Sequence, residues 1–198
     1  MTVIAGVELA PQRPRFVREK AEPEGHILEP EWSGTRVLVR VGHGEPRFVG
    51  YDGPVDAPRE LYDAIASDTQ CGTAIIDGVL TDALDESELE MDPEGNAFVR
   101  EPKPRTVFAA FDLLEVDGES LITVPLLERK RHLESVLKSS PNVRLTAYRA
   151  RDLHAWRETL LEQGFRRAVL KQWNSPYSPG TTADTWLVIE KIREAGRR

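Results

Sequence analysis

The side chains best suited to chemistry in this sequence are carboxylates and one lysine, carried by short segments far apart along the chain. Glu29, Glu31, Asp77 and Glu190 carry the carboxylates, and Lys171 carries the amine. Carboxylates that converge in a fold can hold a cation, and an amine beside a phosphate can act as a nucleophile once it loses its proton. The four acidic residues could form an acidic site, although nearby arginines could equally neutralise them.

Other reactive residue types carry weaker signals. Four histidines stand alone, without the spacing of metal ligands, and Cys71 has no partner within a motif. The sequence contains neither a G-x-x-x-x-G-K segment followed by Ser or Thr nor a G-x-G-x-x-G segment, so it has no recognisable phosphate loop. We therefore predict no metal site from these residues.

Alternating and β-branched segments predict the elements that must position these side chains. Residues 35–41 alternate between polar and apolar types, and a glycine-rich turn then leads to residues 47–49, which predicts a hairpin. Strands outnumber helices and do not alternate regularly with them, so we expect an α+β fold in which sheets pack against helices. The other expected elements are strands at 73–80, 106–114, 168–170 and 185–189, and helices beginning at Pro58, at Pro125 and after a capping Asp152.

Composition limits the classes of partner. The chain has 198 residues, 40% of them hydrophobic, and a net charge of −7, which argues against strong autonomous binding to nucleic acid but leaves room for a local basic groove. We interpret the basic residues at 129–131 and at 149 and 151 as solvated helix faces. No apolar run reaches roughly 18 residues and no secretory signal precedes the first strand, so we expect a cytoplasmic protein without a membrane partner.

Five segments resemble, in order, the signature motifs of the ATP-dependent DNA ligases, in particular the small bacterial end-joining ligases of the LigC and LigD type. The similarity covers roughly residues 25–191. It implies the nucleotidyltransferase fold of DNA ligases and mRNA capping enzymes, which is ATP-grasp-like and has two antiparallel-rich sheets flanked by helices. We expect residues 1–24 to form an extended arm, 25–192 a degenerate adenylation-like domain without an OB-fold domain, and 193–198 a basic tail. The segments are Glu29–Arg36, Gly50–Gly53, Ile75–Leu80, Val107–Leu114 with the following Pro125–Lys130, and Gly164–Lys171 with the following 175–190.

The sequence departs from the family at the positions that do the chemistry. Where the family has the lysine that attacks the α-phosphate of ATP, this chain has Glu31, whose charge repels a triphosphate. The metal-binding glutamate of the family aligns with Arg166. The remaining degenerate positions are Ser33 for an aspartate, Val79 for a glutamate, and Val188 and Glu190 for two phosphate-binding lysines.

Four residues keep the family's identity and could still hold an adenosine. The resemblance assigns Glu29 to adenine, Arg36 to the ribose, Phe111 to stacking on the base and Lys171 to a phosphate. Binding of ATP or AMP without transfer is therefore one expectation. From the residues alone, core packing explains Phe111 equally well, and turn or cap geometry explains Asp77.

These observations predict a catalytically inactive ligase-like domain that works as a binding or regulatory module beside a protein partner, in DNA repair. One alternative is a repurposed nucleotide enzyme that uses Lys171 or the acidic cluster. A second is a purely structural interaction domain.

Overall fold

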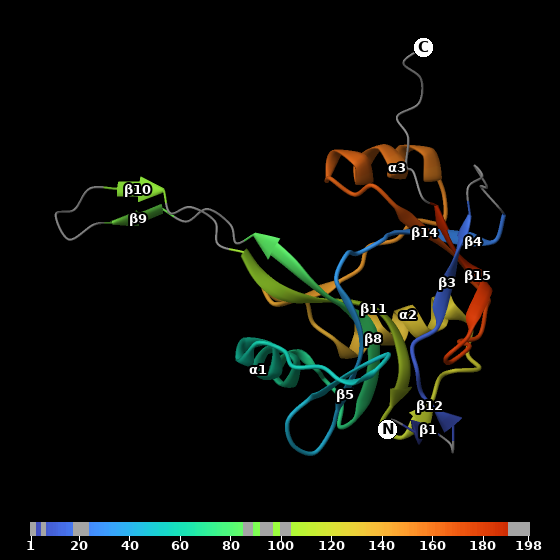
Figure 1. The fold of residues 1–198 in the computed structure, drawn as a ribbon, viewed down its shortest axis with the longest axis horizontal. Coiled ribbons are helices and arrows are strands. Elements are labelled where there is room, and N and C mark those ends of the chain that lie inside the picture. The colour runs from blue at the N-terminus through green and yellow to red at the C-terminus, as the bar shows by residue number, and fades with distance from the viewer. Residues whose placement is uncertain are drawn as a thin grey trace, which may run out of the picture.

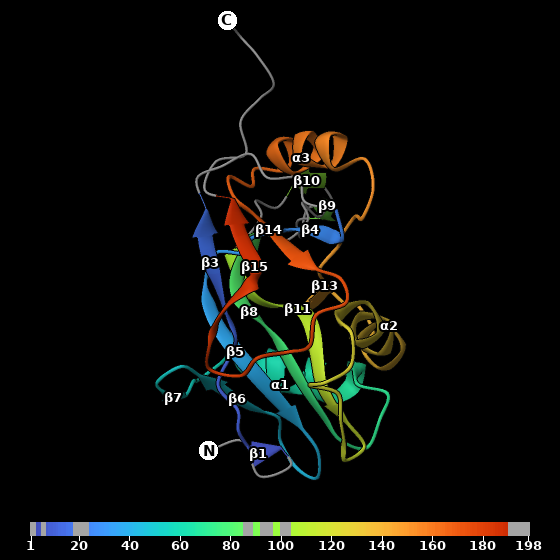
Figure 2. The same cartoon turned by 90° about the vertical axis from the view of Figure 1, so that its right-hand side faces the viewer.

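Two β-sheets lie face to face, and helices cover their outer faces (Figures 1 and 2). The structure is a computed structural model that describes residues 3–4, 7–17, 24–84, 89–91, 97–99 and 104–189. Most strand pairs are antiparallel, and the exceptions are β11 with β13 and β15 with β3. The expected α+β architecture of two antiparallel-rich sheets flanked by helices is confirmed.

The larger sheet has seven strands in the order β12-β11-β8-β5-β6-β7, with β13 paired to β11. Its two long central strands, β8 and β11, run antiparallel through a pairing with two register shifts. The predicted hairpin is present, since β5 pairs with β6. The strands are β5 (Thr35–Val41), β6 (Arg47–Gly50), β7 (Gly53–Pro54), β8 (Ala74–Leu84), β11 (Pro104–Val116), β12 (Glu119–Ser120) and β13 (Val143–Leu145).

The smaller sheet has the order β3-β15-β14-β4. Its strands are β3 (Arg13–Val17), β4 (His26–Pro30), β14 (Ala168–Gln172) and β15 (Thr182–Ile189). β3 comes from the segment expected to be an arm, yet it pairs in parallel with β15 and forms the edge of this sheet. A further two-stranded unit near the N-terminus pairs β1 (Val3–Ile4) with β2 (Val7–Glu8).

The sequence of residues 83–104, acidic and then proline-rich, predicts an exposed loop, but its described residues contain more regular structure. β8 continues to Leu84 and β11 begins at Pro104. Between them, β9 (Leu89–Met91) and β10 (Ala97–Val99) form a small hairpin that lies beyond the ends of the long strands (Figure 1). The loop prediction is therefore wrong for these described strands.

Three helices begin where the sequence predicted: α1 (Arg59–Asp68) after Pro58, α2 (Leu126–Val136) after Pro125 and α3 (Leu153–Glu162) after Asp152. The capping role expected of Asp152 is wrong. Asp152 has a left-handed backbone with φ of 52°, and its side chain makes no capping hydrogen bond. No helix in the described part of the chain is long and apolar enough to cross a membrane.

Strand alternation divides the apolar side chains among three layers. In β5, Val37 and Val39 pack on the side covered by α1 and α2, whereas Leu38 between them packs into the space between the two sheets. The inter-sheet layer also receives Phe111 from β11 and Trp186 from β15. A third cluster joins α3 to the outer face of the smaller sheet. The candidate site is therefore expected between the sheets, where motif residues of the larger sheet meet those of the smaller sheet.

Two glycines permit close approaches that the site requires. A Cβ on Gly78 would lie 2.4 Å from Cε2 of Phe108, so only glycine lets β8 and β11 pack at this point. Gly34 has φ of 137°, and a Cβ there would lie 2.0 Å from the carbonyl oxygen of Leu80. The turn that separates Glu31 from β5 thus depends on a residue without a side chain.

Candidate functional site

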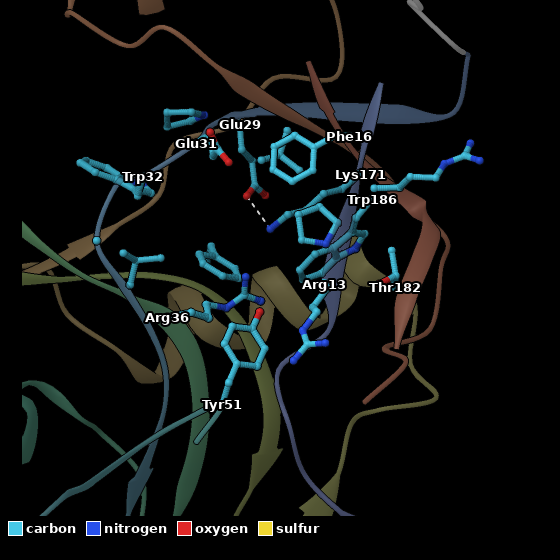
Figure 3. A pocket seen from close by; sticks show the side chains of 17 residues that line it. Arg13, Phe16, Glu29, Glu31, Trp32, Arg36, Tyr51, Lys171, Thr182 and Trp186 are labelled. Atoms are coloured by element: carbon cyan, nitrogen blue, oxygen red, sulfur yellow. Dashed lines mark ion pairs between the residues drawn. The ribbon is translucent and has the colours of Figure 1, made fainter. Parts of the chain in front are cut away.

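A cavity of about 610 Å³ opens between the two sheets (Figure 3). Strands β3, β4, β5, β8, β11, β14 and β15 all contribute to its walls. A cavity of this size is typical of small-molecule sites, which combine apolar walls with a few placed polar groups. Its lining includes the aromatic residues Phe16, Trp32, Tyr51, Phe111 and Trp186 and the charged residues Arg13, Glu29, Glu31, Arg36 and Lys171.

Two lysines hold Glu29 at the base of this cavity. Nζ of Lys171 lies 2.7 Å from Oε2 of Glu29, and Nζ of Lys130 lies 2.5 Å from Oε1. All three residues are buried, and Lys130 also donates to the carbonyl oxygen of Phe111 at 2.9 Å. Burial lowers the pKa of Lys171 to about 8; Glu29 opposes this shift, and Lys130 adds to it. Glu29 is therefore already bound on both oxygens by cations of the protein itself.

The basic run at 129–131 is not a solvated helix face. Arg129 is fully buried and makes a two-pronged pair with Asp112, with both nitrogen–oxygen distances at 2.8 Å. Lys130 is buried on Glu29, so only Arg131 is exposed. The prediction failed because it considered the charges of the helix without the buried carboxylates of β4 and β11 that face them.

A second buried network fixes Arg36. Asp77 accepts from Nε of Arg36 at 2.6 Å and from Nη2 at 2.7 Å. The hydroxyl of Tyr177 donates to the same carboxylate at 2.7 Å and accepts from the backbone N–H of Gln12 at 2.8 Å. Asp77 lies within β8 and is fully buried, so the explanation by turn or cap geometry is wrong. Its carboxylate instead balances the Arg36 charge.

Cations surround the aromatic wall of the cavity. Cζ of Arg36 lies 4.4 Å from the ring centroid of Phe111, and Nζ of Lys171 lies 3.9 Å from it. The same Lys171 atom lies 4.0 Å from the ring centroid of Trp186, which meets Phe111 edge to face. Phe111 both packs in the inter-sheet core and lines the cavity, so the two explanations offered from the sequence hold together.

Glu31 lies between this cavity and a smaller one of about 270 Å³. Its carboxylate pairs with the guanidinium of Arg167, and its backbone N–H donates to the carbonyl oxygen of the same residue at 3.1 Å. Burial raises the pKa of Glu31, and the Arg167 charge opposes part of that shift. Ser33 and Arg166 line the smaller cavity together with Glu31, so the fold brings these three sequence-predicted positions together.

Comparison with known proteins decides the family. The sequence model described as ATP dependent DNA ligase domain matches residues 57–189, which is most of the chain. The chain belongs to the ATP-dependent DNA ligase family. The family resemblance is confirmed; the third, fourth and most of the fifth segment lie within the matched residues, whereas Glu29–Arg36 and Gly50–Gly53 precede them.

Individual ligases support this membership at moderate identity. The multifunctional non-homologous end joining protein LigD of Mycolicibacterium smegmatis is 29% identical over 161 residues, which cover 81% of this chain and 21% of that protein. A DNA ligase of Methanocorpusculum labreanum is 36% identical over 80 residues, or 40% of this chain and 15% of that ligase. The chain thus spans about a fifth or less of the length of these two relatives.

Solved ligase structures share the fold. A mycobacterial DNA ligase D complexed with ATP and MES superposes with a TM-score of 0.68 at 22% identity, covering 92% of this chain and 60% of that one. The ATP-dependent DNA ligase of bacteriophage T7, in complex with ATP, gives a TM-score of 0.52 at 12% identity, covering 84% and 62%. These likenesses confirm the nucleotidyltransferase fold.

The other positions at which this chain departs from the ligase motifs are distributed over the fold. Val79 lines the larger cavity. Val188 is fully buried in the core between the sheets, opposite Val169. Glu190 lies outside the described residues, as does the expected tail at 193–198. At these two described positions, where the family resemblance led us to expect charged residues, the side chains are apolar, and Val188 is packed in the core.

The carboxylates that the sequence suggested as an acidic site pair separately with basic side chains. Glu29 pairs with lysines, Glu31 with Arg167 and Asp77 with Arg36. Within the described ranges, no three His, Cys, Asp or Glu side chains are arranged to hold a metal ion. Each of these three carboxylates is already neutralised by a cationic side chain, so the described residues of the site do not fit a divalent cation.

Sequence reasoning missed the contribution of the N-terminal strand to the site. Arg13 and Phe16 of β3 line the cavity, and the guanidinium carbon of Arg13 lies 4.5 Å from the ring centroid of Tyr51. The alternating pattern from Arg13 to Val17 was the available signal, but parallel pairing with β15 is a long-range feature that the pattern alone does not specify.

Proposed function

We propose that this chain is a ligase-family adenylation domain that does not transfer adenylate and instead works as a binding or regulatory module in DNA repair. The observation that carries the proposal is the Glu31–Arg167 ion pair at the position where the family motif has its nucleophilic lysine. A carboxylate already paired with an arginine offers neither a lone-pair amine nor a positive charge to an α-phosphate.

Electrostatics around Glu31 supports the same conclusion. Catalysis of phosphoryl transfer depends almost wholly on positioning and on neutralising the phosphate charge. Arg166 stands at the position of the metal-binding glutamate, and Val188 replaces a phosphate-binding lysine with a buried apolar side chain. Each lost group of this kind typically costs about 3 kcal/mol of transition-state stabilisation, and loss of the nucleophile removes the covalent pathway itself.

The larger cavity could still hold AMP more readily than ATP. Phe111 and Arg36 remain on its wall, whereas the Glu31 carboxylate repels the further charges of a triphosphate. With a net charge of −7, the domain would bind nucleic acid weakly on its own, so a protein partner would bring it to DNA.

The proposal is tested by incubating the purified protein with α-labelled ATP and Mg²⁺, then denaturing it and measuring retained label. We expect no retained label, while an active ligase of the family, run beside it, becomes labelled. Glu31→Lys is the informative variant, and we expect it to remain unlabelled because Arg166 and Val188 are unchanged. A covalent adduct on the wild-type chain would overturn the proposal.

One observation favours a second function, nucleotide chemistry at Lys171. This lysine lines the cavity, and its lowered pKa leaves an appreciable neutral fraction near pH 8. Its engagement with Glu29 argues against attack on phosphorus, because the ammonium is held at a carboxylate. Label mapped by peptide mass spectrometry to Lys171, and absent in Lys171→Arg, would establish this second function instead.

A further inference from the structure

The first proposed function leaves one buried reactive group without a role, the amine of Lys171. Its Nζ lies 3.9 Å from the ring centroid of Phe111 and 4.0 Å from that of Trp186. The Glu29 carboxylate lies 2.7 Å from the same atom, and in Figure 3 the two side chains meet among the residues that line the cavity. Only 3% of the Lys171 side chain is exposed, and all four residues line the larger cavity. A molecule therefore reaches this amine by entering the cavity.

Two features of this environment activate a lysine toward electrophiles. Burial disfavours the ammonium form, and a second cation nearby disfavours it further. Nζ of Lys130 lies 2.5 Å from the other oxygen of Glu29, so two ammonium groups share one carboxylate. Burial, with a smaller contribution from Lys130 and against the opposing charge of Glu29, lowers the pKa of Lys171 to about 8. Lysines that form imines with carbonyl compounds are activated in this way.

The carboxylate of Glu29 selects the kind of electrophile. A phosphoryl group brings negative charge against this carboxylate, and its transfer to Lys171 removes the cation that pairs with Glu29. A neutral carbonyl group is not repelled, and the protonated imine formed from it keeps a positive charge on nitrogen. The pairing with Glu29 and the cation–ring contacts with Phe111 and Trp186 are therefore retained after the reaction.

The walls of the cavity select the rest of the molecule. A cavity of about 610 Å³ is within the range of small-molecule sites, and flat rings pack well against aromatic walls. An aromatic carbonyl compound therefore suits this cavity better than a short polar one. Besides the two rings around the amine, the aromatic and aliphatic side chains on its walls include those of Phe16, Trp32, Tyr51, Val79 and Val169.

We propose that Lys171 is a covalent binding site that captures a neutral aromatic aldehyde as an imine, with Glu29 as the proton carrier. Glu29 accepts a proton from the ammonium, and the freed amine forms a bond to the carbonyl carbon. The carbonyl oxygen receives that proton and a second one from the nitrogen, both through Glu29, and leaves as water. A C=N bond replaces the C=O bond, the nitrogen keeps one proton and its positive charge, and no oxidant or reductant takes part. This site goes beyond the proposed function and does not depend on the absence of adenylyl transfer.

The test treats the purified protein at neutral pH with benzaldehyde and cyanoborohydride, which reduces an imine to a stable benzylamine, and locates the label by peptide mass spectrometry. We expect Lys171 to be labelled about tenfold faster than the exposed Lys138, whose ammonium is almost wholly protonated at this pH. Lys171→Arg removes the fast label. Lys138→Arg is the matched control and leaves labelling of Lys171 unchanged. No nucleotide is present, so the result is independent of the adenylate assay.

Two further measurements separate a built site from a lysine that is only reactive. Glyoxylate, a short anionic aldehyde, should label Lys138 but not Lys171, because its carboxylate is repelled by Glu29. Lys130→Met removes the second cation, and it should slow labelling of Lys171 by benzaldehyde about three- to tenfold while leaving Lys138 unaffected. Equal labelling of Lys171 and Lys138 by benzaldehyde, label on Lys138 alone, or preferential labelling of Lys171 by glyoxylate would each overturn the proposal.

Discussion

The ammonium of Lys171 lies 2.7 Å from the carboxylate of Glu29, on the neighbouring antiparallel strand of the smaller sheet. The family resemblance assigned these two residues to opposite parts of a nucleotide, the phosphate and the adenine. In this chain they bind each other, and Lys130 takes the remaining oxygen of Glu29. A ligand that used either residue would have to break an ion pair that is already buried.

Stability should rise with pH through the titration of Lys171. The folded-state pKa is about 8 and the ordinary value is 10.5, so between these pH values the unfolded chain holds a proton that the folded chain has released. Folding stability therefore increases across pH 8 to 10.5, by up to about 3 kcal/mol. Urea unfolding of wild type and Lys171→Met at several pH values measures this contribution as the difference between them.

The exposed Lys138 provides the control for that experiment. Lys138→Met should track wild type at every pH, because removing a solvated ammonium changes no buried charge. If the free energies of unfolding of wild type and Lys171→Met changed in parallel from pH 7 to 10.5, Lys171 would have an ordinary pKa. Its amine would then be protonated near pH 8, which would rule out the second candidate function.

Removal of Arg129 should destabilise the fold strongly. Arg129→Met leaves the fully buried carboxylate of Asp112 without its partner, which costs about 3–5 kcal/mol. Arg131→Met, at the exposed end of the same basic run, should stay within about 0.5 kcal/mol of wild type. Urea unfolding measures the free energy of unfolding of both variants. Equal losses would mean that Arg129 is solvent-exposed and that its pair with Asp112 adds no stability.

The contrast between Arg129 and Arg131 illustrates what the sequence could predict. Apolar alternation located β5, and continuous apolar, β-branched runs located β8 and β11, which are buried on both faces; both are local signals. A run of three basic residues contains no such signal. Which of them turns inward depends on Asp112 and Glu29, whose carboxylates are contributed by other strands.

Only those residues of the candidate site that belong to a family motif could be predicted from the sequence. Glu31, Arg36 and Phe111 were located from matched segments, and the cavity does bring them together. Arg13 was not located, since its place depends on parallel pairing between β3 and β15, which are separated by most of the chain. Long-range pairing of this kind is set by the packed sheet as a whole, so the local pattern of residues 13–17 does not specify it.

Tyr177→Phe should loosen the strand that carries Arg13. The Tyr177 hydroxyl links the Gln12 backbone N–H to the carboxylate of Asp77, so its loss leaves a buried donor without an acceptor. We expect a destabilisation of about 1–3 kcal/mol and faster hydrogen exchange at the Gln12 amide. Tyr62→Phe is the control, because the Tyr62 hydroxyl has no hydrogen-bond partner among the described residues and that variant should leave this amide protected. Unchanged protection in Tyr177→Phe would mean that the other contacts of Gln12, with Arg36 and Ser178, and the pairing of β3 with β15 hold it in place without the Tyr177 hydroxyl.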